Sequence, residues 1–231
     1  MSQLLHARWL FPFAAVAASS LCAALIATSD AQAAGEDTQL DRLNSAGHTL
    51  EWNWNPPGHS QRYGHAETLV QADLSGVRTQ LLDFSHYKDL SGGKFKTSRM
   101  IAKDGDNTDV YFQVPVMHGM LTLWYVSRFG PMQVEAPGHE LVEGRFVRGN
   151  IKDMHLQFEM RKVDERFTIL SCNLYVLPSF PAPQSAVDEE LRDACKDAVE
   201  AVRDRSQGFK GDVPFVTPAQ SVPAAAARAA Q

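Results

Sequence analysis

One stretch, IKDMHLQFEMR at residues 151–161, decides the fold class of this chain. Its apolar residues from Met154 onward alternate with polar ones, and a period of two places successive side chains on opposite faces of a β-strand. The run at 167–176 repeats the pattern less regularly. The two runs therefore predict neighbouring strands with one apolar face, which needs a covering layer.

The segment that follows has the spacing of an amphipathic helix. Ser185 and Asp188 resemble a capping box at its start, and Gly208 is placed to end it. We expect this helix to cover the apolar face of the sheet. Its apolar stripe consists of Val187, Leu191, Ala194, Cys195, Ala198 and Val202.

Earlier segments supply the rest of the sheet. Because a parallel pair needs a crossover of about a dozen residues, the short connections between them predict antiparallel neighbours. A short helix capped by Asp73 or Ser75 interrupts the series, and 130–139 is expected to be a loop. The sequence thus predicts an α+β helix-grip fold, a curved antiparallel sheet wrapped around a long C-terminal helix. The further expected strands are 50–54, 63–72, 94–103, 108–116, 120–129 and 140–148.

The first 33 residues have the pattern of a secretory signal peptide, with basic residues, an apolar core and the triplet AQA at 31–33. Cleavage near Ala33 predicts a periplasmic or secreted protein, and an uncleaved membrane anchor is the alternative. Of the mature chain, 34–61 is an N-terminal extension of uncertain structure, 62–207 the folded domain and 208–231 a flexible tail rich in proline and alanine.

Composition argues against several classes of function. The net charge of −5 and the absence of a basic run disfavour nucleic acid as a partner. The histidines form no HxH or HExxH pattern, and there is no P-loop, GxGxxG or GxSxG motif, so we expect neither a metal nor a cofactor. The oligomeric state is not predicted by these patterns.

Two cysteines follow the cleavage site, Cys172 on the last strand and Cys195 on the covering helix, and both fall on inward faces. In an oxidising compartment they can form a disulfide, and otherwise they remain buried thiols that pack as small apolar residues. The sequence leaves both alternatives open.

Residues 62–207 resemble the START-like superfamily, also called SRPBCC, in its branch of polyketide cyclases and coenzyme Q-binding proteins. The likeness is carried by 66–73, by LDFSHY at 82–87, by DGDNTDVY at 104–111 and by the proline-rich entry to the last helix. It implies a ligand site between sheet and helix that holds lipids, quinones, sterols or polyketides.

The resemblance and the predicted facing of the strands together predict which residues line a cavity. The alternative is that these side chains pack on one another and leave no cavity. We expect a carrier or chaperone of an apolar ligand with transient membrane contact. The alternatives are a cyclase-type enzyme and a protein-interaction module without a cavity. The predicted lining residues are Phe112, Trp124, Met154, Leu156, Phe158, Cys172, Leu174, Leu191, Cys195 and Ala198.

Five polar residues are candidates for acid–base chemistry. Such chemistry needs two groups within hydrogen-bond reach of one substrate, and their spacing reveals no such pair. We therefore assign no catalytic residue. The five candidates are Tyr111, His118, Arg128, Asp153 and His155.

Overall fold

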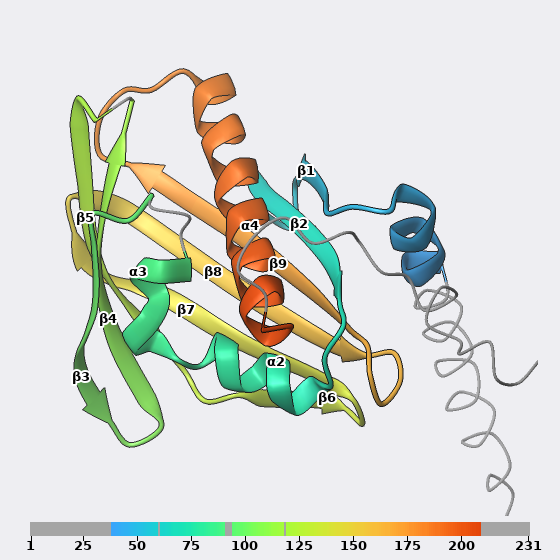
Figure 1. Ribbon diagram of the computed structural model, residues 1–231. Coiled ribbons are helices and arrows are strands. Elements are labelled where there is room, and N and C mark those ends of the chain that lie inside the picture. Colours follow the sequence, from blue (N-terminus) through green and yellow to red (C-terminus); the bar gives the residue numbers. More distant parts are fainter. Residues whose placement is uncertain (1–37, 60, 91–93, 118, 209–231) are drawn as a thin grey trace, which may run out of the picture. The chain divides into compact units, whose positions relative to one another are not determined.

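The computed structural model of the chain describes residues 38–59, 61–90, 94–117 and 119–208, and it contains one antiparallel sheet of nine strands (Figure 1). The strand order is β1-β2-β9-β8-β7-β5-β4-β3, and β6 pairs with β7. The strands are β1 (Leu50–Trp54), β2 (Tyr63–Val70), β3 (Thr97–Asp104), β4 (Asn107–Val116), β5 (Leu121–Phe129), β6 (Gln133–Ala136), β7 (His139–Gly149), β8 (Ile151–Lys162) and β9 (Thr168–Pro178).

The long helix α4 (Gln184–Ser206) lies across the inner face of this sheet and packs on β1, β2 and β9, as the orange-to-red helix in Figure 1 shows. Gly64 makes the close approach to β2 possible: a Cβ atom there would lie 2.4 Å from the backbone carbonyl carbon of Leu191. The arrangement confirms the predicted α+β helix-grip fold.

Three short helical segments close one end of the inner face. They are α2 (Leu74–Leu81), η1 (Phe84–His86) and α3 (Tyr87–Leu90). The Asp73 side chain accepts a hydrogen bond from the Gly76 amide at 3.0 Å, which confirms one of the two predicted caps. On the next turn of α2, Arg78 forms an ion pair with Glu140 of β7, which fixes the helix to the sheet.

The main hydrophobic core lies between the sheet and the helices. Its largest fully buried members include Phe129, Met154, Met160 and Leu170. A second, smaller cluster lies on the outer face, where the helical residues 40–46 bring Leu43 against the sheet. Its other buried members are Leu69, Phe167 and Ile169.

Several boundaries differ from the predicted ones. The capping box is wrong, because α4 begins at Gln184 with Pro183 as its N-cap and no side-chain cap. The expected loop at 130–139 contains β6, and the expected extension at 34–61 contributes β1 as an edge strand. Gly208 follows the end of α4 with φ of 70°, as predicted.

The expected signal peptide at 1–33 and residues 209–231 of the expected tail lie outside the described residues. Within the described part of the chain, no helix is both long enough and apolar enough to span a membrane.

Candidate functional site

The inner face of the sheet and the facing side of α4 hold nine of the ten predicted lining residues. Leu191 is also buried, and the partly buried Leu156, Leu174 and Ala198 pack against the core. The two pockets described below are lined by none of the ten. The five that lie in the buried core are Phe112, Met154, Phe158, Cys172 and Cys195.

Trp124 does not line this space, so that prediction is wrong. The register pairs Phe112 with Tyr125, which places Tyr125 on the inner face and its neighbour Trp124 on the outer face. There Trp124 stacks on Tyr111 with ring centroids 6.4 Å apart and remains 39% exposed.

The packing under α4 is uneven along the strands. On β9, Leu170 and Cys172 are fully buried, whereas Leu174 and Val176 on the same face are only half-buried. Leu156 of β8, which pairs with Leu174, is half-buried too. The inner face is therefore closed beneath the C-terminal half of α4 and more open beneath its N-terminal end. Other half-buried residues packed on the core are Val114, Leu123 and Phe146.

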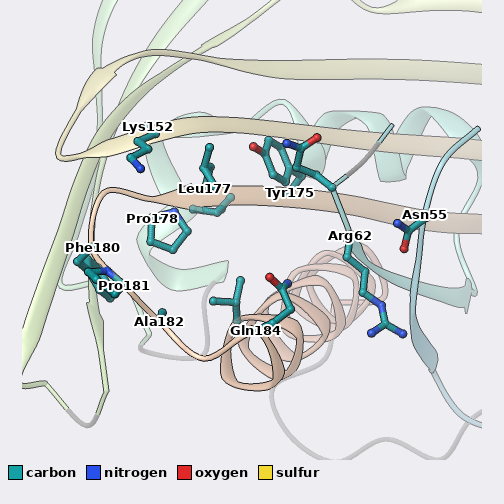
Figure 2. A pocket seen from close by; sticks show the side chains of 13 residues that line it. Asn55, Arg62, Lys152, Tyr175, Leu177, Pro178, Phe180, Pro181, Ala182 and Gln184 are labelled. Carbon is teal, nitrogen blue, oxygen red and sulfur yellow. The ribbon is translucent and has the colours of Figure 1, made fainter. Parts of the chain in front are cut away.

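A pocket of about 700 Å³ lies at this open end, beside the first turns of α4 (Figure 2). It forms because β2 stops pairing with β9 at the Gly64–Leu174 pair, whereas β9 continues to Pro178. Its volume is in the usual range of small-molecule sites, about 300–1,000 Å³. The lining residues are Asn55, Gln61, Arg62, Lys152, Tyr175, Val176, Leu177, Pro178, Phe180, Pro181, Ala182, Gln184 and Val187.

The pocket lining contains two cations and no carboxylate. Arg62 is engaged by the buried Asp188 of α4, with Nη1 and Oδ2 2.9 Å apart, and Gln184 Nε2 donates to the same carboxylate at 2.8 Å. Lys152 forms no ion pair with any described residue. The rim of the pocket therefore carries one uncompensated positive charge, that of Lys152, because the charge of Arg62 is neutralised by Asp188.

Tyr175 presents a hydroxyl to the pocket. Its side chain is 7% exposed, and the hydroxyl forms no hydrogen bond within the described part of the chain. Burial raises the pKa of Tyr175, and the negative charge of Asp153 and the neighbouring Tyr63 raise it further. The hydroxyl is therefore protonated at neutral pH and is available as a donor.

The two cysteines meet beneath α4 as free thiols, so the structure has the second of the two predicted alternatives. Cys195 donates to the backbone oxygen of Gly64 at 3.2 Å and also contacts Cys172. Burial raises the pKa of Cys195, and the neighbouring thiol adds to the shift. The Cys195 thiol is therefore protonated. Both cysteines are buried and serve as packing residues.

The polar residues considered for acid–base chemistry do not converge on the inner face. Tyr111 packs on the outer face beneath Arg99, and Arg128 is paired there with Asp109 at 2.7 Å. His118 lies outside the described residues.

His155 also faces outward, where its Nδ1 lies 3.3 Å from the Tyr63 hydroxyl and its Nε2 3.4 Å from Glu143. Burial lowers the pKa of His155, and Glu143 partly opposes the shift. The side chain of the neighbouring Asp153 accepts a hydrogen bond from the Met154 amide. Burial is the main cause that raises the pKa of Tyr63, and the negative charge of Asp153 raises it further. This outer-face network faces away from the apolar space.

A second pocket of about 440 Å³ is lined in part by Asp83 and Ser85, and His86 follows them at the end of η1. Ser85 Oγ lies 3.0 Å from His86 Nδ1, and Asp83 Oδ2 lies 2.6 Å from the same nitrogen. A nucleophile–base relay uses the two ring nitrogens separately, so this geometry is that of a turn. Arg205 of α4 also binds Asp83, at 3.1 Å. No group of three or more potential metal ligands occurs among the described residues.

Comparison with known proteins supports the fold. No family model matches the chain, and no curated protein matches it. Among solved structures it is similar to a STAR-related lipid transfer protein from Xanthomonas axonopodis, with a TM-score of 0.59, 14% identity and coverage of 69% of this chain and 93% of the other. It is also similar to human StAR-related lipid transfer protein 5, with a TM-score of 0.58, 12% identity and coverage of 80% and 98%.

A START superfamily protein from Mycobacterium smegmatis matches with a TM-score of 0.52 at 15% identity, over 63% of this chain and 97% of the other. The chain has the START-like (SRPBCC) helix-grip fold. The branch of polyketide cyclases and coenzyme Q-binding proteins stays a prediction.

Proposed function

We propose that this protein binds one apolar ligand, such as a lipid, quinone, sterol or polyketide-like molecule, and carries it through an aqueous compartment. One observation carries the proposal: the apolar inner face is only partly buried at Leu156, Leu174 and Val176, and Val176 lines the 700 Å³ pocket. Apolar side chains at the centre of a fold are normally fully covered by other side chains, so a partly covered row beside a pocket favours an apolar ligand.

The energetics of burial are sufficient for such a ligand. A molecule that removes about 300 Å² of apolar surface from water gains about 7 kcal/mol before the cost of association is subtracted. Binding of this kind has few directional contacts, so it tolerates related ligands. A carrier that takes several members of one lipid class fits this physical picture.

The proposal favours binding over catalysis because of where the ionisable groups lie. His155, Arg128 and Asp109 are on the outer face, and the Arg78–Glu140 pair is engaged in fixing α2 to the sheet. General acid–base catalysis would need an acid and a base beside the ligand, and the pocket lining, with Lys152 and Tyr175, includes no histidine and no carboxylate to serve as the base. We propose further that the protein acts in the periplasm or outside the cell after cleavage near Ala33, with transient contact with a membrane when the ligand is exchanged.

Native mass spectrometry of the protein, purified as its own host produces it, tests the proposal directly. We expect a co-purifying apolar molecule at one per chain, identified after organic extraction. Leu174→Glu places a charge in the proposed site and should abolish the adduct. Val134→Glu, the same type of change at a residue of β6 that is 70% exposed, should leave it intact. Protein that carries no adduct and takes up no fatty acid, quinone or sterol would contradict the proposed function.

A further inference from the structure

The rim of the pocket beside α4 has a chemistry that the apolar inner face lacks. We propose that the rim binds the anionic head of the ligand and that the ligand is a long-chain carboxylate, with its head at Lys152 and Tyr175 and its chain on the inner face. This inference rests on the proposed function and narrows it from apolar ligands in general to acidic amphiphiles.

Lys152 is placed at the pocket by an irregularity in β8. Ile151 pairs with Pro178 and Asp153 with Leu177, so Lys152 is the extra residue of a β-bulge. A bulge re-aims the side chain that it inserts, and bulges often occur beside binding sites. Figure 2 shows Lys152 at the rim of the pocket, near Leu177. A lysine held at a pocket without an acidic partner is a ready counter-charge for an anion.

Tyr175 supplies the second contact. Its ring is fixed against Tyr63, with centroids 5.4 Å apart, and its pKa is raised, so the hydroxyl is a donor in a constant position. A carboxylate accepts hydrogen bonds at both oxygens, and the Tyr175 hydroxyl, which has no partner among the described residues, can donate to one of them. Leu177 lies between Tyr175 and Lys152 in Figure 2, so the rim is a polar pair with an apolar side chain in the middle.

The balance of charge indicates a head with a single negative charge. Arg62 is already neutralised by Asp188, so Lys152 is the one pocket-lining cation without a described acidic partner. The nearby Asp153 is not part of the lining, and it accepts from the Met154 amide. One unpaired cation and one hydroxyl donor match a carboxylate better than a doubly charged phosphate ester.

The path for the chain of the ligand follows from the register. Val176 and Val187 line the pocket from the inner side, and Val176 lies next to the half-buried Leu174 on the same face of β9. Leu156 continues the apolar row across β8. Tyr175 and Leu177 alternate with Val176 and lie on the outer side of β9, so a chain that starts at the rim reaches this apolar row around the free edge of β9, beyond its last pair with β2.

A matched pair of ligands separates this inference from the proposed function. Binding of oleate and of oleyl alcohol, which has the same chain without a charge, is measured by calorimetry at pH 7.5 with the protein as its host produces it. We expect oleate to bind more tightly. Lys152→Gln should weaken oleate binding roughly three- to tenfold, the range for a charge-assisted contact at a partly exposed site, and leave the alcohol unchanged.

Lys152→Arg should retain the preference for oleate, and Tyr175→Phe, which keeps the ring contact with Tyr63, should lose part of it. Lys96→Gln is the control, since Lys96 is exposed and has no acidic partner among the described residues.

Equal binding of acid and alcohol, or an undiminished preference in Lys152→Gln, would overturn the inference while leaving the apolar site in place. Tighter binding of dodecyl phosphate than of laurate would overturn the carboxylate assignment. Failure of both oleate and oleyl alcohol to bind would instead overturn the proposed function.

Discussion

The two ends of α4 meet the same sheet in different ways. Toward the C-terminal end, Cys195, Val199 and Val202 are almost completely buried against the core. Toward the N-terminal end, the facing strand residues are half-buried and a pocket adjoins them. The difference teaches that one amphipathic helix can anchor a fold at one end and border a binding site at the other, because β2 is shorter than β9.

The sharpest test compares two leucines on the same face of β9. Leu170→Ala removes a fully buried side chain at the packed end and should cost about 2–5 kcal/mol of the free energy of unfolding. Leu174→Ala removes a half-buried side chain at the open end and should cost about 1 kcal/mol. Urea unfolding measures both losses in the free energy of unfolding, provided that the two variants have the same m-value. Equal losses would contradict the distinction between the two ends.

A second test moves the helix itself. Gly64→Ala adds a Cβ atom 2.4 Å from the backbone of Leu191, so α4 must shift away from β2. Overpacking against backbone should cost about 1–3 kcal/mol and widen the open end. Thermal unfolding gives the loss. Gly58→Ala is a poor control because its φ is 81°, whereas Gly130→Ala meets open space at an ordinary φ and should cost much less.

The ion pair at the open end should contribute less than the packing does. Asp188→Asn keeps the shape of the side chain but removes the charge that binds Arg62, which is 49% exposed and remains solvated. We expect a loss of about 1 kcal/mol. The neighbouring exposed Glu189→Gln should change stability little, and chemical unfolding of both variants checks the difference. A loss as large as that of Leu170→Ala would mean that the open end is held as firmly as the packed end.

The smallest expected effect is the pH dependence of His155, which lies on the outer face of the sheet, opposite Tyr175 of β9. Because burial lowers its pKa, the unfolded chain binds a proton more readily than the folded one does. Stability should therefore fall as the pH drops through the ordinary histidine pKa, about 6.5, and level off below the lowered folded-state pKa. His155→Gln should lose this component in melting curves between pH 5 and 8. An unchanged pH profile in the variant would assign the dependence to other groups.

The periodicity of apolar residues was sufficient to predict those elements that have one apolar and one polar face. The alternation in β8 and the stripe of α4 predict both elements and their facing, including the contact between Cys172 and Cys195. It failed for β5, where Leu123, Tyr125 and Phe129 face inward but Trp124 between them is apolar as well. With large apolar residues on both faces, only the register with β4 decides which face is inside.

The pocket could not be predicted because it arises from a difference in length between two paired strands. Arg62, Lys152 and Tyr175 are far apart in the sequence and share no motif. The bulge that places Lys152 has no glycine or proline within β8 to mark it. The prolines at 178, 181 and 183 were the one local signal, since they indicate an irregular segment between β9 and α4.

The overhang of β9 past β2 also bears on solubility. Residues 175–177 lie beyond the last β2 pair, and such an edge is a template for pairing with another chain. Pro178 then ends the strand with a residue that has no amide hydrogen, and Pro181 and Pro183 keep the following segment from extending the edge. A shorter β2 would enlarge the opening but lengthen this edge, so the width of the opening is limited by the tendency of the protein to aggregate as well as by the size of its ligand.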